Sequence, residues 1–146
     1  MIKKIKILDI LAINTSSGKK QAYLIKPRGG YDRLDFQFDD NVEVDSSCSL
    51  LWKNNYYVIG GWREKRQVSM VNGYRLKRVG SLDFNFYMGG CAVLNQVTVA
   101  LCFDGYEKDL CRISNDPLGS YTKLPNSYFD HQRTRAAAVN GKNTSG

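Results

Sequence analysis

The residues that could carry out chemistry form no catalytic arrangement in this sequence. The chain of 146 residues has one histidine, His131, and neither a Gly-x-Ser-x-Gly motif nor a cysteine–histidine signature surrounds it. No Walker A sequence occurs, and the glycines of Met88–Gly90 lead into a predicted strand rather than a helix, so they form no dinucleotide fingerprint. We therefore predict a protein that is not an enzyme and that needs no cofactor.

The four cysteines of the chain do not indicate a metal site. They are too few for a disulfide-dense scaffold, and none belongs to a CxxC pair. With only one histidine beside them, they do not complete a set of zinc ligands. These cysteines are Cys48, Cys91, Cys102 and Cys111.

Cys102 and Cys111 are predicted to lie on the second and third strands of one hairpin. Directly opposed residues on antiparallel strands have Cα atoms about 4.5–5.5 Å apart, which is within disulfide range. A secreted protein could bridge this pair, whereas in a reducing cytosol the two would be small buried hydrophobic side chains. Both alternatives stay open: the sequence slightly favours the cytoplasm, and a bonded pair would indicate an extracellular protein.

The net charge of +7 does not by itself indicate a nucleic-acid partner. The lysines and arginines are scattered, and no zinc-finger, homeodomain or RNA-recognition pattern accompanies them. No run of 18 uncharged apolar residues occurs, so we expect no transmembrane helix and no membrane partner. Residues 1–13 start with basic and then apolar residues, but Lys6 and Asp9 interrupt them, which makes a poor secretory signal.

The strongest pattern in the sequence is an internal repeat. Cys48–Gly61 and Cys91–Gly105 both run from a small residue through an apolar pair, a polar break and a β-rich run to a glycine turn, and Cys91 follows Cys48 by 43 residues. A third copy begins at Arg135. A second match supports the repeat, because Leu34–Phe38 recurs 48 residues later as Leu82–Phe86.

Within each repeat the pattern predicts short β-strands. Tyr56–Ile59 and Val97–Phe103 are rich in β-branched and aromatic residues and end in glycine turns. Gln67–Val71 and Tyr74–Val79 alternate polar with apolar residues around Asn72-Gly73, a strong hairpin signal. The second repeat adds strands near residues 109–113 and 120–124. Only residues 1–13 could form a helix.

Four short strands in a repeat of about 45 residues are typical of a propeller blade. The residues resemble the kelch family, whose blade has a small-residue strand, a hydrophobic strand ending in a glycine doublet, a third strand, and a fourth strand that carries an aromatic residue. The second copy departs from this pattern with Asp104-Gly105 in place of the doublet and Tyr121 in place of tryptophan. The resemblance implies an all-β fold of four-stranded antiparallel blades.

The resemblance also implies a division of the chain. We expect an N-terminal extension at 1–20 that is irregular or a short helix, the last strands of a preceding blade at 21–44, complete blades at 45–90 and 91–134, and the start of a further blade at 135–146. A closed propeller needs about four to eight blades. We therefore expect a fragment of a longer propeller, or self-association of several copies. Large aromatics are expected to fill the space between blades: Trp52, Tyr57, Phe84, Phe86 and Phe103.

The resemblance implies a non-catalytic module that binds another protein through its loops. The candidate binding residues follow the glycine turns or open a blade: Trp62, Arg63, Arg66, Tyr106 and Arg135. One alternative is an extracellular propeller that binds glycans or matrix components. Another is a galactose-oxidase-like enzyme scaffold, which the sequence does not favour because the chain lacks the histidines that copper would need.

Overall fold

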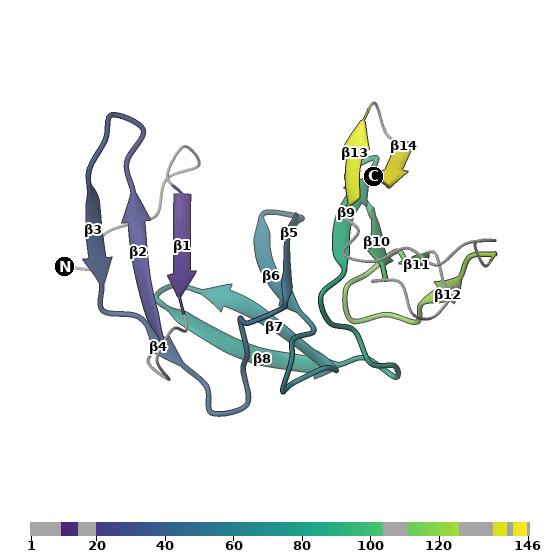
Figure 1. The fold of residues 1–146 in the computed structure, drawn as a ribbon, viewed down its shortest axis with the longest axis horizontal. Helices are drawn as coiled ribbons and strands as arrows, with labels where there is room; N and C mark the ends of the chain where they lie inside the picture. The colour runs from purple at the N-terminus through teal and green to yellow at the C-terminus, as the bar shows by residue number, and fades with distance from the viewer. Residues whose placement is uncertain (1–9, 15–19, 104–110, 126–135, 140–141, 146) are drawn as a thin grey trace.

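The computed structural model describes residues 10–14, 20–103, 111–125, 136–139 and 142–145. In these ranges the chain contains β-strands and no helix, so the all-β prediction is confirmed (Figure 1). The strands are β1 (Ile10–Asn14), β2 (Gln21–Ile25), β3 (Tyr31–Leu34), β4 (Gln37–Phe38), β5 (Cys48–Trp52), β6 (Asn55–Ile59), β7 (Gln67–Asn72), β8 (Arg75–Ser81), β9 (Gly90–Leu94), β10 (Thr98–Cys102), β11 (Cys111–Ser114), β12 (Thr122–Lys123), β13 (Ala136–Val139) and β14 (Lys142–Ser145).

Two four-stranded antiparallel meanders form the centre of the fold. Strands β5 to β8 pair in sequence order in one sheet, and strands β9 to β12 do the same in another. Strands β13 and β14 form a separate hairpin. Strand β9 contacts both β5, the first strand of the other meander, and β13, the first strand of the hairpin. No sheet closes on itself in the described part of the chain.

The N-terminal region differs from the expectation at residues 10–14, and its later strands are divided between two sheets. Residues 10–14, expected to be irregular or helical, form strand β1, because each of them pairs with a residue of β2. Residues 31–38 do not form one continuous strand. Strand β3 pairs with β2, the chain then breaks at Asp35 and Phe36, and β4 pairs in parallel with β8 of the first meander.

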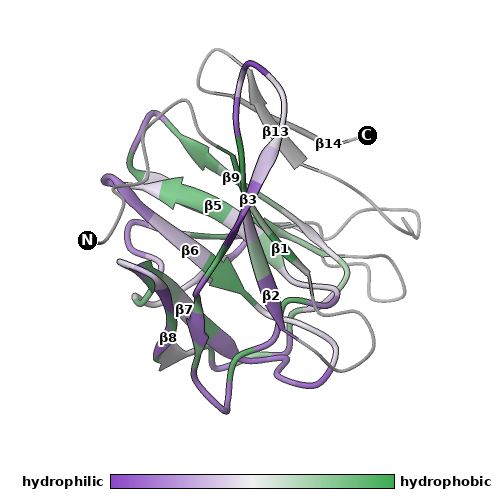
Figure 2. Ribbon diagram, turned by 90° about the vertical axis from the view of Figure 1, so that its left-hand side faces the viewer, coloured by the Kyte–Doolittle hydropathy of each residue, from purple (hydrophilic) through white to green (hydrophobic). Residues whose placement is uncertain are grey.

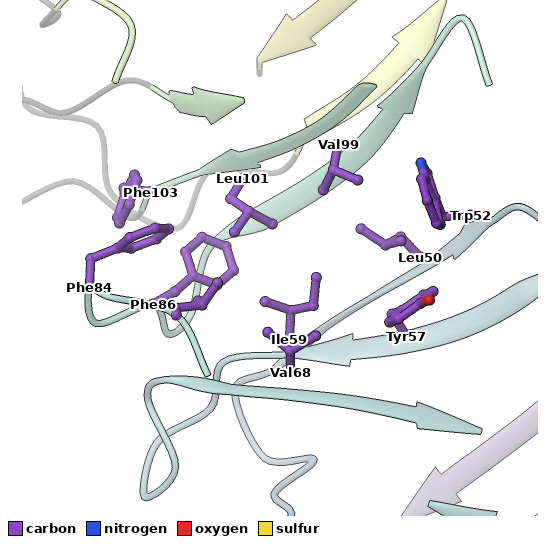
Figure 3. Packing of buried hydrophobic residues seen from close by; sticks show 11 residues of the cluster. Leu50, Trp52, Tyr57, Ile59, Val68, Phe84, Phe86, Val99, Leu101 and Phe103 are labelled. Carbon is purple, nitrogen blue, oxygen red and sulfur yellow. The ribbon is translucent and has the colours of Figure 1, made fainter. Parts of the chain in front are cut away.

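The main hydrophobic core lies between the two meanders. Figure 3 shows side chains from β5, β6 and β7 pointing toward those of β10 and of the connection between β8 and β9. The five aromatic residues predicted to pack internally all belong to this cluster, so that prediction is confirmed. Trp52 is anchored as well, because its indole Nε1 donates a hydrogen bond of 2.6 Å to the Val97 carbonyl. The cluster comprises Leu50, Trp52, Tyr57, Ile59, Val68, Leu82, Phe84, Phe86, Val99, Leu101 and Phe103.

A smaller core lies beneath strand β4. Val58 alternates along β6 with core residues of the main cluster, so it faces the opposite side of the sheet, where it packs with Val42 and Leu76. Phe36 and Phe38 pack against this group. In Figure 2, strands β5 and β9 are coloured as hydrophobic, and several of the connecting loops are coloured as hydrophilic.

The glycine doublet after β6 is required by the backbone. Gly60 has φ of +70° and Gly61 has φ of +149°, a region that side chains with a Cβ rarely adopt. A Cβ on Gly60 would lie 2.1 Å from the Phe86 carbonyl oxygen, and one on Gly61 would lie 2.6 Å from Cγ of Glu43. The doublet therefore lets three chain segments meet at the end of the first meander.

Candidate functional site

Three connections at one end of the strands are joined into one surface, which we call the loop face. It consists of residues 43–47, 60–66 and 82–89. Because strands in a meander alternate in direction, the loop after β6 and the loop after β8 lie at the same end of the sheet. Backbone hydrogen bonds join all three segments: Gly61 N to Phe86 O (3.0 Å), Trp62 N to Asp45 O (3.0 Å), Phe86 N to Lys65 O (2.8 Å), Leu82 N to Arg66 O (2.7 Å) and Met88 N to Ser46 O (2.8 Å).

The buried side chain of Gln67 forms hydrogen bonds to two of these three segments. Its amide nitrogen donates hydrogen bonds to the Gly60 carbonyl (2.7 Å) and to the Glu43 carbonyl. Its amide oxygen accepts from the Glu43 backbone N–H (3.0 Å) and from the Ser69 hydroxyl (2.8 Å). Because Gln67 is fully buried and both ends of its amide are bonded, it fixes residues 43 and 60 relative to each other.

An exposed feature of the loop face is a pair of aromatic rings with a lysine over them, which we call the aromatic clasp. Trp62 is 52% exposed and Tyr87 is 38% exposed. Their ring centroids lie 5.6 Å apart with the planes at 75°. The Lys65 ammonium lies 5.2 Å from the Trp62 ring centroid and 4.8 Å from that of Tyr87. Trp62 and Tyr87 differ from the other exposed apolar side chains in the described part of the chain because their rings adjoin each other and share one cation.

Charged side chains surround the aromatic clasp. Arg66 donates through Nε to the Asn85 amide oxygen at 3.0 Å, which links two of the three segments. Arg63 is exposed on the same loop. Glu64 forms an ion pair of 2.8 Å with Arg78, a residue of β8.

The structure brings together only some of the residues selected from the sequence. Trp62, Arg63 and Arg66 all lie on the loop face. Tyr106 and Arg135 lie outside the described residues, as does His131. The sequence patterns do not single out Tyr87 or Lys65, although Tyr87 directly follows the repeated segment 82–86, which could have marked it as the start of a loop.

All four cysteines are bonded in the structure. Cys102 and Cys111 face each other on β10 and β11 with Cα atoms 4.0 Å apart, and their sulfurs form a disulfide. Cys48 and Cys91 form a second disulfide, with Cα atoms 6.1 Å apart. This second bond joins the first strands of the two meanders, β5 and β9, and it was not predicted from the sequence.

Neither a metal-binding cluster nor a membrane-spanning helix is found in the described part of the chain. Within it, no cluster of three or more histidine, cysteine, aspartate or glutamate side chains could hold a metal ion. None of its described segments forms a helix long and apolar enough to span a membrane. Burial raises the pKa of Tyr121, with a smaller contribution from Asp116, and the Tyr121 hydroxyl donates to the Pro117 carbonyl at 3.0 Å, so this tyrosine has a structural role.

Comparison with known proteins gives no independent identification. No family model matches the chain, and no curated protein matches it.

Proposed function

We propose that this chain is a non-catalytic module of the kelch-repeat type that binds another protein through its loop face. The observation that carries this proposal is the aromatic clasp, in which Trp62 and Tyr87 are exposed on loops that hydrogen bonds hold in place. Tryptophan, tyrosine and arginine are the residues that contribute most to binding energy at protein interfaces. Rigid loops also lose little conformational entropy when a partner binds.

Three features support a propeller-like arrangement of the kelch type. Each meander has four antiparallel strands, and the two meanders pack face to face through one shared core. The first strands of the two meanders, β5 and β9, contact each other, and β9 also contacts β13. The glycine doublet Gly60-Gly61 stands at the end of the second strand, where the kelch pattern has it, and both glycines have positive φ. A propeller with further blades would place the loop face at one end of its ring.

A second candidate function is binding of a glycan or matrix component outside the cell. The two disulfides favour this alternative, since such bonds persist in oxidising compartments and are rare in the cytosol. An exposed tryptophan can bind the apolar face of a sugar ring as well as a protein side chain. The two functions share the same surface and differ in the chemistry of the ligand.

The proposed function can be tested by quantitative affinity capture followed by binding of purified components. Trp62→Ala removes the larger ring of the clasp, and Tyr56→Ala is the matched control, because Tyr56 is also an exposed aromatic but lies on β6 away from the loop face. The proposal predicts a protein that wild type and Tyr56→Ala capture and that Trp62→Ala does not. The purified pair should then bind with at least tenfold lower affinity when Trp62 is alanine, which corresponds to about 1.4 kcal/mol.

Two results would contradict the proposal. One is a purified partner that binds wild type and Trp62→Ala equally. The other is an oligosaccharide on a glycan array that binds the wild type but not Trp62→Ala, combined with the finding that no protein depends on Trp62 for binding. That result would favour the second candidate function.

A further inference from the structure

We propose that the aromatic clasp is a receptor for a weakly hydrated organic cation carried by the partner, either an arginine guanidinium or a quaternary ammonium group, and that Lys65 occupies this receptor in the free protein. The inference rests on the proposed function, since it names the partner group that the loop face would take. The Lys65 ammonium already lies over both rings, at 5.2 and 4.8 Å from their centroids. A cation in this position is attracted by the negative faces of both rings.

Lys65 is a weak occupant of the aromatic clasp. Its ammonium forms no hydrogen bond or ion pair within the described part of the chain, and only the two rings contact its charge. A primary ammonium is strongly hydrated, whereas guanidinium and alkylated ammonium groups lose little hydration when they contact a ring. Because Lys65 has a flexible side chain, it can leave the rings while its backbone carbonyl keeps its bond to Phe86 N.

The charge of the loop face is compatible with a cationic ligand although the whole chain carries +7. The three segments contain four carboxylates, Glu43, Asp45, Glu64 and Asp83, and three cations, Arg63, Lys65 and Arg66. Glu64 is neutralised by Arg78, so the rest of the loop face is balanced.

The chain contains a natural contrast to this site. Lys53 lies 4.6 Å from the ring centroid of Trp52, but Trp52 is only 8% exposed and its indole N–H is bound to the Val97 carbonyl. Most of the Trp52 surface is packed in the main core, whereas about half of Trp62 is exposed. Lys53→Ala is therefore the matched control for Lys65→Ala.

The test is a titration of the 146-residue chain with tetramethylammonium and, separately, with N-acetyl-arginine amide, followed by NMR shifts of the two indole N–H groups. Ammonium chloride serves as the strongly hydrated comparison cation. At least one of the two organic cations is expected to shift the Trp62 signal and not the Trp52 signal, with a dissociation constant on the order of 10 mM. The cation that binds more tightly identifies the partner group.

The variants give the decisive comparison. Lys65→Ala removes the internal competitor, so the dissociation constant should fall about three- to sixfold, while Lys53→Ala leaves it unchanged. Tyr87→Ala should weaken binding. The inference is overturned if Lys65→Ala binds the organic cations no more tightly than wild type, or if ammonium binds as well as they do. A partner that depends on Trp62 but not on this cation site would leave the proposed function standing and overturn only this inference.

Discussion

Replacing Cys48 and Cys91 together with serine tests how the two meanders are held to each other. The disulfide closes a loop with a sequence separation of 43 residues, whereas the Cys102–Cys111 disulfide closes one of 9. The chain-entropy relation assigns about 4 kcal/mol of stabilisation to the longer loop and about 2.6 kcal/mol to the shorter one. The double serine variant at Cys48 and Cys91 should therefore be the less stable of the two.

The assay is urea unfolding followed by tryptophan fluorescence, with both double serine variants measured beside the wild type. Trp52 is buried in the core between the meanders, so its fluorescence reports the opening of that core. A difference of about 1.4 kcal/mol between the variants is expected, equal to a tenfold change in the unfolding equilibrium. Equal losses, or a larger loss at Cys102 and Cys111, would refute the reasoning that the disulfide between β5 and β9 restrains the larger part of the chain.

Three further variants test the local contacts. Gln67→Met should lower the free energy of unfolding by about 3 kcal/mol, because it leaves several buried polar groups without partners; a loss below about 1 kcal/mol in a urea titration would contradict this. Gly60→Ala should destabilise the fold by more than about 2 kcal/mol in the same assay, since its Cβ would collide with the Phe86 carbonyl at a positive φ. The hydrogen bond from Arg75 holds the pKa of Asp39 below its usual value, so this carboxylate stabilises the folded state above pH of about 4 and the stabilisation is lost as the pH falls through the lowered pKa. Asp39→Asn should accordingly reduce the dependence of the melting temperature on pH in that acid range, and an unchanged dependence would count against it.

Local sequence patterns predicted most strands of the two meanders. The alternation of residues 67–79 predicted the hairpin of β7 and β8, although the turn lies one residue later than expected. Asn72 still pairs with Arg75, so the two turn residues are Gly73 and Tyr74. Period-two alternation fixes which residues form strands more firmly than it fixes the last pair before a turn.

Features that depend on contacts between distant segments were missed. Strand β1 has no alternation of its own and exists because Ile10 to Asn14 pair with β2. Cys48 and Cys91 occupy equivalent positions of the repeat, but their bond depends on β5 and β9 lying side by side. Similar sequence also did not mean identical structure, because Phe38 pairs with β8 at the edge of the sheet while Phe86 is buried in the main core.

Local sequence patterns also predicted only part of the candidate site. The glycine doublet marked the loop that carries Trp62, so local sequence was enough to find one wall of the aromatic clasp. Tyr87 comes from the connection between β8 and β9, and the hydrogen bonds of Phe86 to Gly61 and Lys65 bring it next to Trp62. No short-range pattern encodes such an approach of two loops.

The most direct measurement is hydrogen–deuterium exchange of the chain with and without a partner identified by affinity capture. Binding through the loop face predicts added protection in residues 43–47, 60–66 and 82–89. It predicts little change at the turns on the opposite end of the strands, residues 53–54, 73–74 and 95–97. Protection confined to those opposite turns, with none at the loop face, would contradict the proposed function.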